Sequence, residues 1–138
     1  MDKWSKIRAK LVDAQEKLYH INNKFRKSKD DLDTKWRLLN DFNKGLNQKF
    51  NEKYSIVLSA YSKMSDATED MLEAAIGTIE RYRMVNEEEF LTRRYELERE
   101  YNDLEDRYKK EYRKQEKLIE QLSSELKSYQ TDEGREEI

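Results

Sequence analysis

The sequence predicts an all-α protein, a long antiparallel helical hairpin or coiled coil whose further assembly into a helical bundle stays open. Apolar residues recur at alternating steps of three and four, as they do where helices pack along a narrow seam. The chain of 138 residues is 42% charged and 36% hydrophobic, with no proline, a composition that suits long helices with broad solvated faces. A turn signal at residues 65–69 then divides a single hairpin domain, 1–138, into two arms.

The first helix is expected over about residues 3–64. Two successive steps of four, 46→50→54, predict a stutter that relaxes supercoiling locally. Gly45 is the weakest helical point, because glycine costs a helix about 1 kcal/mol relative to alanine; a break there, giving three helices, is one alternative. The expected seam comprises Trp4, Ile7, Leu11, Ala14, Leu18, Ile21, Phe25, Ser28, Leu32, Leu39, Phe42, Leu46, Phe50, Tyr54, Val57, Tyr61 and Met64, widened by Trp36 and Leu38.

The turn is expected at about residues 65–68. Asp66 and Glu69 have the spacing of a capping box, in which each side chain accepts a hydrogen bond from a main-chain amide of the helix start. The second helix is expected over about 69–129, followed by a frayed tail, 130–138, which contains a glycine and no seam residue. Its main seam comprises Phe90, Leu97, Tyr101, Leu104, Tyr108, Tyr112, Ile119, Leu122, Leu126 and Tyr129.

Charge is distributed unevenly between the two arms. Residues 1–63 carry fifteen Lys/Arg and eight Asp/Glu, a net charge of +7, whereas residues 64–138 carry thirteen and twenty-two, a net charge of −9. Opposite charges favour pairing of the first arm with the second over pairing of like with like. The uneven charge and the central turn signal therefore count against the other alternative, one uninterrupted helix that dimerises along its length.

The residue inventory argues against an enzyme and against a bound metal or cofactor. His20 is the only histidine and the chain has no cysteine. The residues needed for a zinc site of ordinary ligands or for a nucleophile–histidine triad are therefore missing. No glycine-rich phosphate-binding loop is present in the sequence. We therefore expect no catalytic, cofactor-binding or metal-binding residues.

Nucleic acid and membrane are not expected partners. The basic cluster at residues 24–29 is followed at once by Asp30, Asp31 and Asp33, and the chain as a whole is mildly acidic, unlike most nucleic-acid-binding domains. No apolar run is long enough to span a bilayer, and the N-terminal segment lacks the apolar core of a signal peptide. The sequence predicts a cytoplasmic protein.

The apolar segment around the turn is the predicted partner-binding site. It carries apolar residues on more than one helical stripe, whereas a two-helix hairpin covers only one stripe on each arm, so the rest would be exposed. A ladder of tyrosines in the second arm suits either the intramolecular seam or an interface equally well. The predicted partner-binding residues are Ile56, Val57, Leu58, Tyr61, Met64, Met71, Leu72, Ile76, Ile79, Tyr101, Tyr108 and Tyr112.

Two segments resemble the LXG-associated α-helical proteins, the targeting factors of type VII secretion. These are the aromatic stretch TKWRLLNDFNKGLNQKFNEKY and the later block EEEFLTRRYELEREYNDLEDRYKKEYRK. The resemblance implies a non-enzymatic chain that binds the N-terminal helical domain of an LXG toxin together with a second small helical protein, and that is secreted with its cargo. It also implies an export signal of the Tyr-x-x-x-Asp/Glu form, for which Tyr129 and Glu133 are the candidates. No Trp-x-Gly turn is present.

Other functions fit the same pattern. A self-associating structural or assembly protein, like the coiled coils of phages or of flagellar export, needs no cargo. A phage-encoded inhibitor could use the apolar tip to block a host protein. The sequence leaves the partner's identity, and the choice between self-association and a different helical partner, open.

Overall fold

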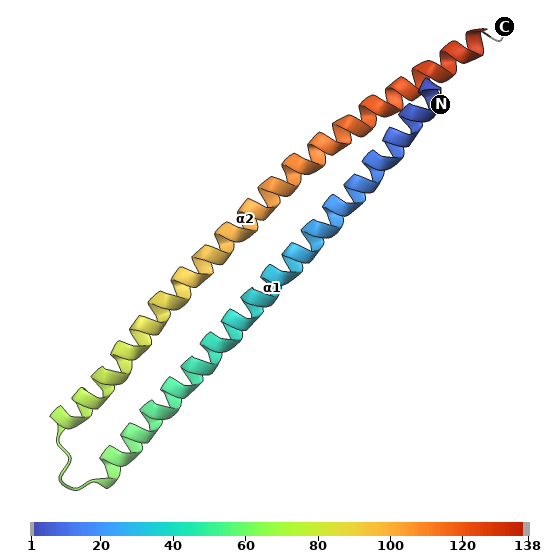
Figure 1. Cartoon of the computed structure of the whole chain (residues 1–138). Helices are drawn as coiled ribbons and strands as arrows, with labels where there is room; N and C mark the ends of the chain where they lie inside the picture. Colours follow the sequence, from blue (N-terminus) through green and yellow to red (C-terminus); the bar gives the residue numbers. More distant parts are fainter. Residues whose placement is uncertain (1, 137–138) are drawn as a thin grey trace. The chain divides into compact units, whose positions relative to one another are not determined.

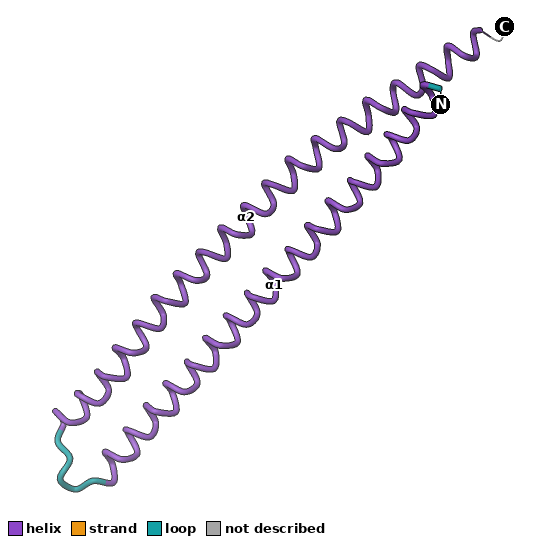
Figure 2. Tube along the Cα trace, in the orientation of Figure 1, coloured by secondary structure: helices purple, strands orange, loops and turns teal. Residues whose placement is uncertain are grey.

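The computed structural model describes residues 2–136, with the side chains described as far as residue 130. Two helices, α1 (Lys3–Lys63) and α2 (Glu69–Glu136), are joined by a short connection at 64–68, and the described residues contain no strand (Figures 1 and 2). The predicted all-α helical hairpin is confirmed. Because α1 is one continuous helix and a non-helical connection follows it, neither the three-helix alternative nor the single uninterrupted helix describes this fold.

The chain divides into two compact units. The terminal unit comprises Met1–Asp31 with Tyr101–Ile138, and the turn unit comprises Leu32–Glu100. Each unit pairs a segment of α1 with a segment of α2, and each is described by itself below. That residues 1–138 form one domain stays a prediction.

Asp2 starts α1 as its N-cap. The Ser5 amide donates a hydrogen bond to Asp2 Oδ1 at 2.7 Å, and the Lys6 amide donates to the Asp2 main-chain carbonyl at 3.2 Å. The Ser5 amide is one of those that a helix start leaves without an internal partner, and the Lys6 bond is the first i→i−4 bond of the helix. The hydrogen bonds from Ser5, first that of its backbone amide, lower the pKa of the Asp2 carboxyl below its ordinary value of 3.8.

Thr68, not Asp66, caps α2. The Met71 amide donates to Thr68 Oγ1 at 3.3 Å, and the Leu72 amide donates to the Thr68 carbonyl at 3.2 Å. The predicted capping box was therefore wrong, because the helix starts at Glu69 and its cap must be the residue just before. Glu69 and Asp70 fall in the first turn, where negative charge interacts favourably with the helix dipole.

In the turn unit the seam of α1 differs from the predicted one at single positions. Two successive steps of four occur at 28→32→36, and Leu39, Leu46, Phe50, Val57 and Tyr61 keep their predicted places. Asn43 is half-buried in place of Phe42, which is 66% exposed, and Leu38 is 60% exposed rather than widening the seam. The residues of α1 in this unit that are buried or half-buried at seam spacing are Leu32, Trp36, Leu39, Asn43, Leu46, Phe50, Val57 and Tyr61.

In the terminal unit the predicted seam holds. The α2 seam residues from Tyr101 to Tyr129 are buried or half-buried, as are their counterparts on α1. The cores are thin: in the described residues the buried hydrophobic side chains are Ala14, Leu32, Leu97 and Leu122, and none of the side chains is completely buried.

The end of α2 also differs from the prediction. The helix continues to Glu136 instead of ending at 129. Segment 130–136 contains no proline, so its backbone can continue the i→i−4 hydrogen bonds even without seam residues. Residues 137–138 of the predicted tail lie outside the described part of the chain.

Candidate partner-binding surfaces

The predicted tip residues fall into two groups of different exposure. Exposed side chains lie at the start of the connection and beside it on both helices, and they are Ile56 (66%), Leu58 (40%), Met64 (48%) and Met71 (53%). The others are half-buried, and they are Val57, Tyr61, Leu72, Ile76 and Ile79. The physical reason is that two helices cover one stripe on each other, and the apolar residues here occupy more than one stripe. The exposed group is therefore the part of the predicted site that is available to another molecule.

Exposed apolar side chains are concentrated in the turn unit. In the described residues of the terminal unit, the large hydrophobic side chains that are exposed are Val12, Tyr19 and Leu118. Those of the turn unit are the four tip residues above together with Leu38, Phe42, Tyr54, Tyr82, Met84, Val85, Leu91 and Tyr95. Scattered single exposures are normal, but contiguous apolar patches on a soluble protein usually mark association sites.

The three tyrosines of the predicted site lie in the terminal unit and are half-buried. Tyr108 stacks on Phe25 with a centroid distance of 4.1 Å, and its hydroxyl donates a hydrogen bond of 2.6 Å to Asn22 Oδ1. Tyr112 lies 5.7 Å from Tyr108, ring centroid to ring centroid. The ring of Tyr108 therefore joins α1 to α2, as expected of a tyrosine that packs its face and keeps its hydroxyl near polar groups.

Sequence reasoning missed the polar seam residues. Gln115 is only 5% exposed, and its Nε2 donates a hydrogen bond of 2.8 Å to the main-chain carbonyl of Ala14. In the turn unit Asn86 Nδ2 donates to Asn43 Oδ1 at 3.5 Å. A search for apolar residues passes over these side chains. The seam periodicity alone could have identified Gln115 as a seam residue, because it lies three residues after Tyr112 and four residues before Ile119.

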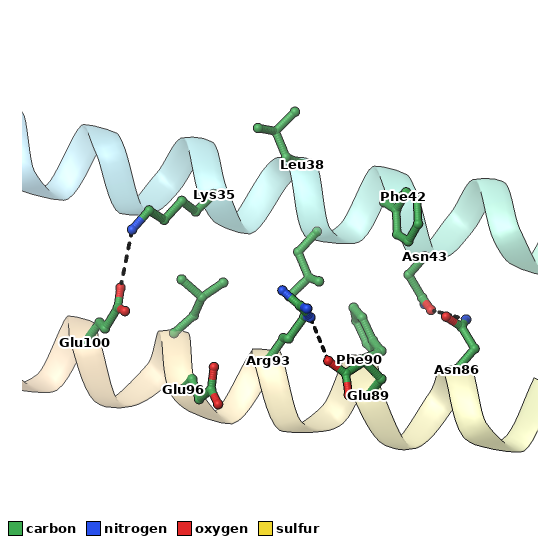
Figure 3. A pocket seen from close by; sticks show the side chains of 12 residues that line it. Lys35, Leu38, Phe42, Asn43, Asn86, Glu89, Phe90, Arg93, Glu96 and Glu100 are labelled. Atoms are coloured by element: carbon green, nitrogen blue, oxygen red, sulfur yellow. Dashed lines mark hydrogen bonds and ion pairs between the residues drawn. The ribbon is translucent and has the colours of Figure 1, made fainter.

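Two grooves lie along one face of the turn unit. The first, about 610 Å³, has Leu38 and Phe42 of α1 along its lining (Figure 3). The second, about 630 Å³, has Tyr82 and Val85 of α2 along its lining. Both grooves include Asn86 and Glu89, so they form one continuous surface, which we call the groove face. Leu39, Leu46, Phe50, Ile79, Phe90 and Leu97 supply the other apolar lining.

Both apolar and charged side chains line the rim of the groove face. Leu38, Phe42, Tyr82 and Val85 are 60%, 66%, 67% and 66% exposed, and Figure 3 shows the Leu38 side chain pointing away from α2. Among the charged lining residues, Lys35 Nζ lies 3.9 Å from Glu100 Oε2, and Arg93 Nε lies 2.9 Å from Glu89 Oε1. Exposed ion pairs of this kind contribute about 0–1 kcal/mol to stability, so their charges remain usable by a bound molecule.

The candidate export signal is only partly described. Tyr129 is half-buried on the seam of α2 in the terminal unit. Glu133 lies within α2, but its side chain is outside the described side chains. Whether the pair can be read by a secretion system stays a prediction.

The described residues carry few features typical of a catalytic or metal-binding site. His20 is exposed, with its ring centroid 5.9 Å from that of Tyr19. Across the described residues, no group of three or more His, Asp or Glu side chains is placed to hold a metal ion. Neither helix, over its described part, has a stretch apolar enough to cross a bilayer.

Comparison with known protein families, with curated proteins and with solved structures finds no match for this chain. The class of protein is therefore defined by its own geometry. It is an all-α helical hairpin with a thin seam and a turn unit that exposes many of its apolar side chains.

Proposed function

We propose that this chain is a non-enzymatic interaction protein that binds a helical protein partner through the exposed apolar side chains beside its turn. The single observation that carries the proposal is the exposure of Ile56, Leu58, Met64 and Met71 on both sides of the connection. Helices bind one another by laying apolar side chains into grooves at helical spacing. Methionine adds flexible, polarizable surface that adapts to the shape of a partner.

A partner helix that docks here covers surface that the hairpin itself leaves in water. Fully burying a large aliphatic side chain contributes about 1.5–3 kcal/mol, and a few such side chains usually dominate an interface. Four side chains that are 40–66% exposed are enough for a specific site, provided the partner is itself helical and apolar on one face.

The particular role we propose is that of a targeting factor or chaperone for a type VII secretion substrate. The support is the resemblance of segments 34–54 and 87–114 to the LXG-associated α-helical proteins. On this proposal the partner is the N-terminal helical domain of an LXG toxin, joined by a second small helical protein. Tyr129 and Glu133 would contribute the export signal, and the chain would leave the cytoplasm with its cargo.

The test is co-purification from the native host with identification of the bound protein, repeated with a tip variant. Ile56→Asp with Met71→Asp places two charges among exposed side chains and should abolish binding while leaving the helical content unchanged. The pair Leu72 and Ile76 is less suitable, because both are half-buried and would disturb the seam.

A matched control is available in the terminal unit. Val12 and Leu118 are 46% and 42% exposed, so Val12→Asp with Leu118→Asp introduces the same charges, at somewhat lower exposure, in the terminal unit. Retention of the partner by the tip variant, or its loss in the control alone, would contradict the proposed site. An LXG toxin among the bound proteins would support the secretion role, and its absence from a specific complex would count against that role alone.

A further inference from the structure

The groove face of the turn unit has an arrangement of charge that a second copy of the same chain would complement. In its lining, α1 contributes two charged residues, Lys35 and Lys53, both basic. From α2 come Glu89, Glu96 and Glu100, with Arg93 held against Glu89 at 2.9 Å. One edge of the face is therefore basic and the other is predominantly acidic.

The same asymmetry holds through the whole turn unit. Residues 32–63 carry six Lys/Arg and three Asp/Glu, a net charge of +3, and residues 64–100 carry five and eleven, a net charge of −6. A partner that presents an acidic helix to α1 and a basic helix to α2 would be attracted along both edges at once. Another copy of this turn unit carries those two helices side by side.

We propose that the groove face of the turn unit binds the groove face of a second copy, forming a four-helix arrangement whose two-fold axis runs along the helices. With this axis, α1 of each copy lies across from α2 of the other at the same level. Lys35, which lies 3.9 Å from Glu100 within one copy, therefore faces the glutamate edge of the other copy, and this contact occurs twice. A two-fold axis across the helices would instead set α1 against α1 and lysine against lysine. The charges therefore select one of the two face-to-face arrangements.

The apolar part of the face suits this occupant. Leu38 and Phe42 come from α1, and Tyr82 and Val85 come from α2, so both helices supply rim side chains that reach beyond the intramolecular seam. In a two-fold contact each patch is used twice, which doubles the apolar surface that the four side chains remove from water. This inference does not depend on the partner proposed above, because the groove lining includes none of the four exposed tip residues.

The test is the oligomeric state of the full-length chain, measured by sedimentation over a concentration series. We expect a wild-type dimer. Phe42→Asp with Val85→Asp should raise the dimer dissociation constant about 100-fold or more, because charges at the centre of an interface remove its principal contacts. Both side chains are 66% exposed in the single chain, so the helical content measured by circular dichroism should not change.

The matched control is Met84→Asp with Leu91→Asp. These side chains are 60% and 54% exposed but belong to neither groove, so this variant should dimerise as the wild type does. A wild type that stays monomeric at every concentration would overturn the proposal. Equal weakening by the control pair and the groove pair would overturn it as well.

Charge exchange tests the direction of the two-fold axis. Lys35→Glu with Lys53→Glu makes both edges acidic, and Glu89→Lys with Glu96→Lys makes both more basic, so each variant alone should dimerise more weakly than the wild type. Mixed together they should form a heterodimer, which native mass spectrometry distinguishes by its mass when one of the two variants is labelled with ¹⁵N. If each charge variant dimerises as tightly as the wild type, the edges do not meet and the proposed arrangement is wrong.

Discussion

Gln115 Nε2 donates a buried hydrogen bond of 2.8 Å to the main-chain carbonyl of Ala14, linking α2 to α1 in the terminal unit. Both residues are 5% exposed. Ala14 has a side chain small enough for the longer glutamine to reach past it to the backbone. Because a shift of either helix would leave the glutamine amide buried without this acceptor, the contact favours one register of the two helices over its neighbours.

Gln115→Ala should lower the free energy of unfolding by about 1–3 kcal/mol, since the hydrogen bond is lost and a space is left on the seam. Gln115→Leu should cost less, because it keeps the volume and removes the polar group together with its need for a partner. Urea unfolding followed by circular dichroism at 222 nm measures both variants. A larger loss for leucine than for alanine would contradict this expectation, since both variants lack the hydrogen bond and only leucine keeps the volume.

Tyr108→Phe should lower the free energy of unfolding by about 0.5–1.5 kcal/mol, because it removes the hydroxyl that donates to Asn22 and keeps the ring that stacks on Phe25. Asn22→Ala should have an effect of similar size. The double variant should be less destabilised than the sum of the two single variants, since both remove the same interaction. Strict additivity in this double-mutant cycle would contradict a direct bond between the two side chains.

Thr68→Ala should destabilise the start of α2 by about 1 kcal/mol, the usual cost of removing an N-cap side chain. Asp66→Ala should have little effect, because the first-turn amide of Met71 binds Thr68 Oγ1. Hydrogen exchange of the amides of Met71 and Leu72 reports this difference directly. Faster exchange in the Asp66 variant than in the Thr68 variant would instead support the capping box of Asp66 and Glu69 that the sequence suggested.

Gly45→Ala and Gly77→Ala should each stabilise the protein by about 0.4–1 kcal/mol. Both glycines lie inside helices, and a Cβ built at either position meets nothing within 4 Å. Alanine therefore gains helix propensity and restricts the unfolded chain without a clash. Thermal unfolding measures the change, and destabilisation at Gly45 would indicate a local conformation other than a regular helix.

The sequence was sufficient to predict the two helices and the place of the turn, since apolar periodicity and a polar connection decide both. It was insufficient where polar residues occupy the seam. A rule that follows apolar residues chose Phe42 over Asn43, although the helical phase after Leu32 turns Asn43 towards α2 and leaves Phe42 in water. Thr68 was missed for a related reason, because two capping signals overlap at the turn and only the observed helix start decides between them.

The candidate site was predictable as a region but not residue by residue. Counting apolar residues around the turn indicated that some must be exposed, but which ones depends on the rotation of each helix about its axis. Ile56 and Met71 lie on the outer faces, while Leu72 and Ile76 turn towards the seam. The groove face could not be foreseen at all, because it depends on which flanks of two antiparallel helices lie on the same side.

Oxidative footprinting of the methionines, in the free chain and in its complex with the helical partner, tests the proposed surface most directly. Met64, Met71 and Met84 are 48%, 53% and 60% exposed, so all three should be oxidised readily in the free protein. We expect partner binding to protect Met64 and Met71 beside the turn and to leave Met84 as reactive as before. Equal reactivity of Met64 and Met71 with and without a bound partner would contradict it.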